Sequence, residues 1–431
     1  MANETDDELE RRRPRHALTT LRHRNFRLIW CGQLVSTIGG QMQTVAIAWH
    51  LYVLTGSSFK VGLVAFFGIA PFIVLSLVGG AIADRLDRKR ILITSQVLTM
   101  LTSAALVAAT LSGNISPGLI YAISFVSGMT RAFDAPARQA MIPNLVPAEE
   151  LANALTLNTL LRQTATIIGP GLGGLVLGLL GVSATYALNM LSFLAPIYAL
   201  LVMDPLPAMG ATGERGWELA AGGLRFVRSE PVVMSVLGLD FLVSMLGSTR
   251  ALFPALALEV LDVGEEGLGL LYAAPAVGAV MGALVLGGLG GRWLHPLIIL
   301  VVSGAFGLFT VAFGLSHLFA LSLLMLFGTG VADVIGEVLR ATLVQLRTPD
   351  ALRGRVTAVN VVFTGGGPQL GQVQSGALAS WVGPAEAAVI GGCAVLAVVA
   401  MFALNPHLRR QPAPARLQTG AEAPTRPKTA G

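Results

Sequence analysis

The sequence predicts an all-α integral membrane protein in which twelve transmembrane helices form two pseudo-symmetric six-helix bundles. Of its 431 residues, 54% are hydrophobic and 12% are charged, whereas a soluble domain carries about 25% charged residues. Twelve apolar windows are long enough to cross a bilayer, which takes about 20 helical residues. An internal repeat divides these windows into two sets of six.

The twelve windows fall into two blocks, residues 28–203 and 232–404, which we interpret as the two bundles. We expect the spans at residues 28–53, 59–83, 91–112, 117–142, 152–180, 183–203, 232–258, 267–290, 296–316, 318–343, 356–382 and 384–404. Residues 204–231 place basic residues between apolar residues at helical spacing. This pattern predicts a cytoplasmic linker with an amphipathic segment along the inner interface; a plain tether between the bundles is the alternative.

Two polar segments flank the predicted membrane region. Residues 1–27 contain seven arginines and no apolar core of a signal peptide, so we interpret them as a basic cytoplasmic tail. Residues 405–431 are rich in Pro, Ala and Arg, a composition that predicts a disordered cytoplasmic tail.

The basic residues predict how the chain is oriented. Of 29 Lys and Arg residues, 24 fall in the tails, loops and span ends of one side, and only Lys60 falls at a span end of the other. The positive-inside rule therefore predicts that both termini are cytoplasmic. The same distribution explains the net charge of +5: basic residues meet lipid headgroups, and no nucleic-acid partner is expected.

The two blocks are related by a shift of 202 positions. The identical pairs are Gly80/Gly282, Gly128/Gly330, Arg138/Arg340, Pro147/Pro349, Asn158/Asn360, Gly169/Gly371 and Gly174/Gly376. One register over nearly a hundred residues indicates a duplicated six-helix unit, which is common in transporters.

A hairpin between the second and third spans concentrates charged residues. Residues 80–90 read Gly-Ala-Ile-Ala-Asp-Arg-Leu-Asp-Arg-Lys-Arg. This stretch resembles the signature G-x-x-x-D-R-x-G-R-[KR]-[KR] of the major facilitator superfamily. Arg85 and Lys89 occupy basic positions of that signature, and Asp87 stands where it has glycine.

The resemblance implies the major facilitator fold and a role for the hairpin in switching between access states. In the family's terms, Gly80 lets helices pack closely, and Asp84 faces the N-terminal end of the eleventh helix. A carboxylate there gains about 0.3–1 kcal/mol. Arg88 completes a charge relay that latches one access state, with Asp134 as its expected partner.

The fifth span carries a second family pattern. Gly169, Pro170, Gly173 and Gly174 resemble the antiporter motif G-x-x-x-G-P-x-x-G-G, with Ala165 in place of the first glycine. Proline removes one backbone donor and bends a helix, and glycines let a neighbouring helix approach. A bent packing seam with no role in coupling is the alternative interpretation.

Four further stretches resemble one branch of the superfamily. They are residues 24–30, 54–58, 133–140 and 224–228. The branch is the transmembrane secretion effector family, which includes the bacterial enterobactin exporter. The resemblance implies export of siderophores or other secreted small molecules.

Several ionisable residues lie within the predicted spans. Asp240 lies near the middle of its span without a charged neighbour at i±3 or i±4. Loss of hydration there favours the neutral carboxyl, so Asp240 is our first candidate for the proton carrier and Asp333 the second. A basic partner for Asp240 elsewhere in the fold remains open.

Two other charged residues, Arg162 and Glu337, complete this set of candidates for proton coupling or the substrate cavity. Arg162 could meet an anionic substrate or be anchored by a carbonyl group. Glu337 and Arg340 are spaced for a local ion pair on one helix.

Enzymatic and metal chemistry find no support in the sequence. Six histidines and two cysteines are widely scattered, and no G-x-x-x-x-G-K-[ST] phosphate loop occurs. We therefore expect no catalytic residues, no metal, no cofactor and no ATP hydrolysis.

These observations predict a proton-coupled secondary transporter that exports a small molecule by alternating access, as siderophore and multidrug efflux antiporters do. Its expected partners are the substrate, protons and the lipid bilayer, and we expect a monomer in the bacterial cytoplasmic membrane. An importer on the same scaffold and a non-transporting membrane sensor are the alternatives.

Overall fold

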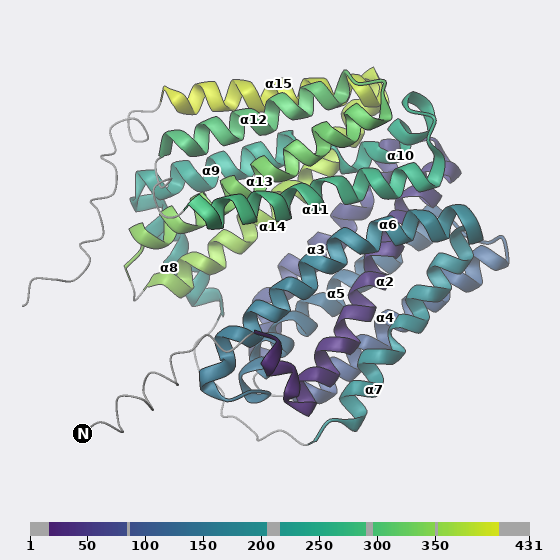
Figure 1. Ribbon diagram of the computed structural model, residues 1–431, viewed down its shortest axis with the longest axis vertical. Coiled ribbons are helices and arrows are strands. Elements are labelled where there is room, and N and C mark those ends of the chain that lie inside the picture. Colours follow the sequence, from purple (N-terminus) through teal and green to yellow (C-terminus); the bar gives the residue numbers. More distant parts are fainter. Residues whose placement is uncertain (1–16, 84–86, 205–215, 290–295, 350–351, 405–431) are drawn as a thin grey trace, which may run out of the picture.

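The computed structural model describes residues 17–83, 87–204, 216–289, 296–349 and 352–404 (Figure 1). These ranges are almost entirely helical. The first half contains η1 (Ala17–Arg22), α2 (Arg24–Thr55), α3 (Ser58–Ala83), α4 (Arg88–Leu111), α5 (Pro117–Met141), η2 (Ile142–Asn144), η3 (Ala148–Glu150), α6 (Leu151–Ser192) and α7 (Leu194–Val202). After α8 (Gly216–Ser229), the second half contains α9 (Pro231–Leu246), η4 (Arg250–Leu252), α10 (Phe253–Ala255), η5 (Leu256–Val260), α11 (Gly264–Leu289), α12 (Pro296–Gly314), α13 (Phe319–Arg347), α14 (Arg353–Val382) and α15 (Pro384–Ala403).

Eight helical stretches of the described residues are long and apolar enough to cross a membrane. One of them, 148–202, supplies two spans because the chain reverses at Gly181, where φ is 81° and ψ is 177°. Glycine adopts this positive φ without steric cost. Helices α2, α5 and α14 are equally long but more polar, and they complete the twelve predicted spans. The predicted fold is confirmed.

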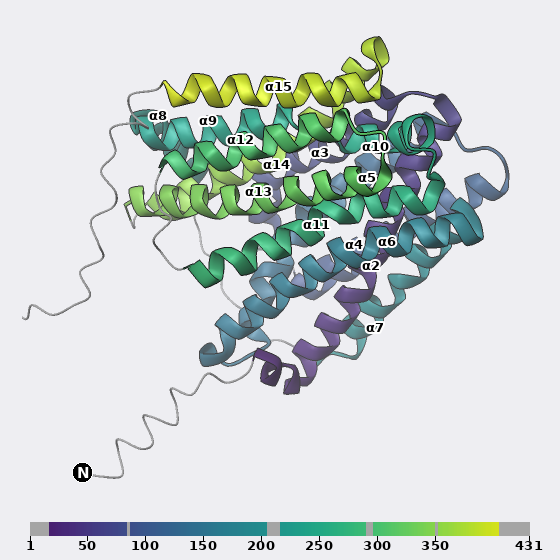
Figure 2. The same cartoon turned by 45° about the horizontal axis from the view of Figure 1, so that its top comes forward.

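The internal repeat appears as equivalent packing in the two halves. Gly128 of α5 lies against the backbone of α3, and its repeat partner Gly330 of α13 lies against the backbone of α11. The outer helices follow the same plan, with α12 and α15 packed side by side (Figure 1, Figure 2). The shift of 202 positions therefore corresponds to a real structural equivalence.

The seventh span departs from the prediction because it is not one helix. Helix α9 ends at Leu246, and the chain continues through η4, α10 and the single π-helical turn η5. In the break, the Ser248 hydroxyl donates to the Pro368 carbonyl of α14, at 3.2 Å. Irregular backbone at membrane depth is tolerated where it is buried in protein or lines a cavity.

The start of α4 explains one departure from the family signature. Asp87 is the N-cap of α4, and its carboxylate accepts a hydrogen bond from the Lys89 amide at 2.9 Å. Such a cap stabilises a helix by about 1 kcal/mol, which a glycine would do less well. Gly80 lies near the end of α3, while Asp84 and Arg85 lie outside the described residues.

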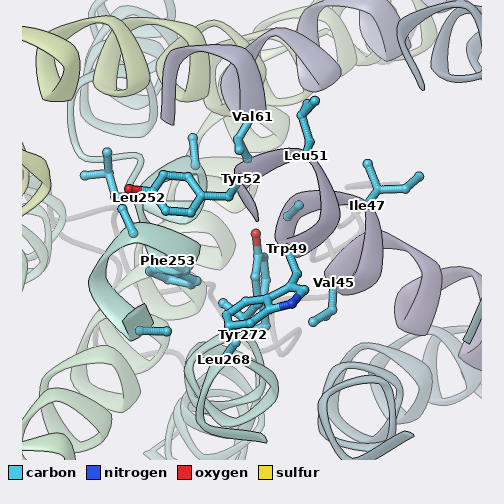
Figure 3. Packing of buried hydrophobic residues seen from close by; sticks show 14 of the residues in the cluster. Val45, Ile47, Trp49, Leu51, Tyr52, Val61, Leu252, Phe253, Leu268 and Tyr272 are labelled. Carbon is cyan, nitrogen blue, oxygen red and sulfur yellow. The ribbon is translucent and has the colours of Figure 1, made fainter. Parts of the chain in front are cut away.

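The two halves meet at one end of the molecule, which we call the closed end, and diverge towards the other (Figure 1). Buried side chains of both halves pack together there, and we call them the closed-end cluster. Its members include Val45, Ile47, Trp49, Leu51, Tyr52, Val61, Leu252, Phe253, Leu268 and Tyr272 (Figure 3). Phe253 and Tyr272 meet edge-on with ring centroids 5.0 Å apart, and the Tyr52 hydroxyl donates to Glu259 of the other half.

Glycines bring the two halves into backbone contact beside this cluster. A Cβ on Gly174 of α6 would lie 2.7 Å from the Cα of Gly269 in α11. A Cβ on its repeat partner, Gly376 of α14, would lie 2.4 Å from the Ser58 carbonyl oxygen of α3. A larger side chain at either position cannot fit without moving the helices apart, so the glycines are required for closure.

Candidate functional site

A cavity of about 630 Å³ lies between the two halves and shares Ile47, Val61 and Tyr272 with the closed-end cluster. From there it extends to Gln33, Asp134 and Arg138, towards the opposite ends of α2 and α5. Its volume falls within the range of about 300–1,000 Å³ typical of small-molecule sites.

The wall of the cavity is polar for a membrane protein. Six glutamines line it: Gln33, Gln41, Gln43, Gln96, Gln369 and Gln372. Some bond to neighbouring helices; for example, Gln41 donates to the Thr166 hydroxyl at 3.1 Å and Gln43 accepts from Asn189 at 2.7 Å. Most come from α2 and α14, and they contribute to the polar character of these two spans.

Four charged residues line the same cavity: Arg131, Asp134, Arg138 and Arg250. Asp134 pairs with Arg138, one turn along α5, and accepts a hydrogen bond from Gln96 at 3.0 Å. Arg88 instead donates to the carbonyl of Ala140, at 3.0 Å. In this conformation Asp134 is paired with Arg138, which lies nearer on the same helix, and its pairing with Arg88 in a latched access state stays a prediction.

A buried ion pair lies within the second half. Asp240 of α9 and Arg340 of α13 are joined by a contact of 2.6 Å, and each side chain is only 7% exposed. Asp240 lies roughly 14 Å along the helix from Pro231, about half the thickness of a bilayer core. Asp240 thus has a basic partner on another helix, which was the possibility left open by the sequence.

Two more carboxylates stand near Arg340 on α13. Asp333 is 3.9 Å from the Arg340 guanidinium and 57% exposed. Glu337 is also exposed and, among the described residues, has no ion pair within 4 Å. The expected pair of Glu337 with Arg340 is wrong, because the guanidinium turns over Gly336, which has no side chain to block it, and reaches Asp240.

Arg162 does not join this arrangement. It is exposed on α6, donates to the Thr159 hydroxyl at 3.3 Å and is not part of the cavity wall. The structure thus brings Asp240, Asp333 and Glu337 together around Arg340 and leaves Arg162 outside.

The glycine motif of α6 faces two different helices. Gly169 and Gly173 lie against Gln41 and Met42 of α2, within the same half. Gly174 lies against α11 of the other half, and the Pro170 carbonyl is adjacent to Gly269 there. The motif is therefore a packing seam that also belongs to the contact between the halves.

Sequence reasoning missed the cavity wall itself. Arg131, Arg250 and the six glutamines were not among the candidates. A usable signal was present in α2, where Gln33, Thr37 and Gln41 recur every four residues and so share one helix face.

A family model described as transmembrane secretion effector matches residues 15–422. The chain belongs to this family. It is accordingly a membrane transporter and not an enzyme.

Curated relatives of this family member span nearly its whole length. The enterobactin exporter EntS of Citrobacter koseri is 29% identical over 401 residues, which cover 93% of this chain and 96% of the relative. EntS of Escherichia coli O127:H6 is 29% identical over 392 residues, covering 90% and 93%.

Solved transporters share the fold of this family member at low sequence identity. The nucleoside transporter NupG has a TM-score of 0.71 at 11% identity, covering 88% of this chain and 98% of NupG. A bacterial homologue of the iron transporter ferroportin, in an inward-facing state, has a TM-score of 0.66 at 15% identity, with the same coverage of 88% and 98%.

Proposed function

We propose that the protein exports a small molecule in exchange for protons, with the cavity opening alternately to the two sides of the membrane. The observation that carries this proposal is the Asp240–Arg340 pair, a buried titratable pair in the second half of the molecule. The relatives named enterobactin exporters support export and suggest a siderophore or another secreted metabolite as cargo.

The pair offers a simple way to couple protons to movement. In this conformation Arg340 bonds to Asp240, and its Nε has no hydrogen-bond partner among the described residues. A proton on Asp240 would cancel that attraction and leave Asp333 as the nearest carboxylate to Arg340. The link between α9 and α13 would then depend on whether a proton is bound.

The orientation follows from the distribution of basic residues. With both termini in the cytoplasm, the closed end faces outwards and the cavity is reached from the cytoplasm. This conformation is the one that receives cargo for export. We place the protein in the bacterial cytoplasmic membrane as a monomer.

The moving parts are two bundles, residues 28–203 and 232–404, joined by the linker 204–231. The hairpin residues Asp84 and Arg85, with Arg88 and Lys89, would hold the opposite access state. In the described conformation Arg88 and Lys89 bond instead to the carbonyls of Ala140 and Met203, so they are not engaged in a latch here.

An importer would use the same fold, and the direction of cargo movement decides between the two. A strain lacking the gene should lose at least one small molecule from its culture medium and accumulate it inside the cell. Comparing metabolites of medium and cells with those of a complemented strain measures this. Loss of uptake, with no compound missing from the medium, would instead identify an importer.

Replacing Gly376 with a residue that has a larger side chain should open the closed end. Gly376→Val places a side chain against the Ser58 carbonyl, so α3 and α14 must separate and outside access to the cavity should increase. A cysteine in place of Thr37, which lines the cavity, reports this in a background lacking Cys31 and Cys393. We expect it to react several times faster with an impermeant thiol reagent added to intact cells.

The matched control for this change is Gly366→Val on the same helix, because a side chain at Gly366 would meet open space. Its labelling rate should equal that of the parent protein. Equal rates for both valine variants would show that the glycine contact does not hold the closed end.

A further inference from the structure

Arg131 faces the cavity without an ion pair. It lies in the middle of α5, and its guanidinium carbon is 5.6 Å from the centre of the Phe72 ring. The nearest acid, Asp134, is occupied by Arg138 and Gln96. Among the described residues, Arg131 therefore has an aromatic neighbour but no carboxylate within 4 Å.

Arg250 faces the same cavity from the other half. It begins η4, directly after the break in the seventh span. Its backbone is fixed because its carbonyl accepts a hydrogen bond from the Tyr272 hydroxyl at 3.0 Å. Asp333 lies within electrostatic reach, but among the described residues its ion-pair contact is with Arg340.

The cavity thus carries more positive than negative charge. Of the residues that the structure describes, three arginines and one aspartate line it, and that aspartate is already paired. A charge in the middle of a membrane costs several kcal/mol unless it has a partner or water. Arg131 and Arg250 both face the cavity, one from each half, and neither forms an ion pair among the described residues. This arrangement indicates a binding place for a negatively charged ligand.

We propose that the cargo is a small anion whose charged group binds between Arg131 and Arg250. This inference rests on the proposed export function and adds the chemical class of the cargo. The guanidinium fork suits planar oxyanions such as carboxylates, which it binds through paired hydrogen bonds. The six glutamines of the wall would bond to the polar, uncharged remainder of the molecule.

The position of the two arginines also links binding to the contact between the halves. Arg131 belongs to the first half and Arg250 to the second, so an anion held by both bridges the two halves. A neutral molecule of the same shape would not bridge them in this way.

The test compares matched ligands on the purified full-length protein. A panel of aromatic and aliphatic carboxylates, each paired with its uncharged carboxamide, is assayed by thermal stabilisation at neutral pH. We expect carboxylates to stabilise the protein at lower concentrations than their amides. Arg131→Gln and Arg250→Gln should each weaken carboxylate binding about tenfold or more, as loss of a charged hydrogen bond predicts.

Arg162→Gln is the matched control, because Arg162 is exposed but outside the cavity wall; it should leave the preference unchanged. Arg131→Lys should bind carboxylates better than Arg131→Gln, since it keeps the charge. The melting temperature of each unliganded variant shows whether it is folded.

No preference for any carboxylate over its amide, or a preference that survives in both glutamine variants, would overturn the proposal. Because binding requires no proton gradient, this result is independent of proton-driven export. Failure of the coupling experiments with intact carboxylate binding would instead refute the export mechanism alone.

Discussion

Asp240→Asn should abolish uphill export while leaving the protein folded and able to bind cargo. Asparagine resembles the protonated aspartate and cannot release a proton. The proton gradient can therefore no longer drive export through residue 240. Folding should persist because the amide oxygen of the new side chain can still accept a bond from Arg340, and Asp333 remains 3.9 Å from that guanidinium. Downhill exchange of cargo should continue.

The measurement is cargo uptake into everted vesicles energised with a proton gradient. Uptake by Asp240→Asn should fall to the level of vesicles without the transporter. Asp204→Asn is the control, because Asp204 forms an exposed pair with Arg24 and should export normally. Full export by Asp240→Asn would remove it as the proton carrier and direct attention to Asp333.

Arg340→Gln should be the most destabilising single substitution in this cluster. It leaves Asp240 ionised and buried without its partner, and breaking a buried pair in this way costs about 3–5 kcal/mol. The double variant Asp240→Asn with Arg340→Gln removes both charges and should recover most of that loss. Thermal unfolding of purified protein in detergent measures both effects.

Arg347→Gln on the same helix is the control. Arg347 contacts Glu230 at 3.8 Å, and both side chains are about one-third exposed, so its loss should cost less than about 1 kcal/mol. If Arg340→Gln and Arg347→Gln lowered stability equally, or if the double variant were no more stable than Arg340→Gln, the pair would not be a buried interaction in solution.

The fold could be predicted because membrane insertion depends on local composition. Apolar windows and the 202-residue shift depend on sequence alone, and both correspond to helices and packing in the structure. The cap at Asp87 was also within reach, since aspartate before a helix is a common N-cap. The break after Leu246 was missed because Gly247, Ser248 and Thr249 were included in a long apolar window.

The site could be predicted only in part, because it depends on which faces of distant helices meet. Asp240 was identified by its isolation on its own helix, whereas its partner Arg340 is a hundred positions away. Local spacing favoured Glu337 for Arg340, and only the structure shows that Gly336 lets the guanidinium turn towards α9. Likewise, only the three-dimensional structure distinguishes the cavity arginines Arg131 and Arg250 from arginines that have structural roles.

The most direct test of proton-coupled export follows luminal pH in everted vesicles, using the compound that a deletion strain fails to secrete. Adding this cargo to vesicles with an acidic lumen should make the lumen more alkaline as cargo accumulates, because protons leave in exchange. Vesicles with Asp240→Asn should show neither change. Cargo accumulation that proceeds with no proton movement, or after the gradient is collapsed, would contradict the account.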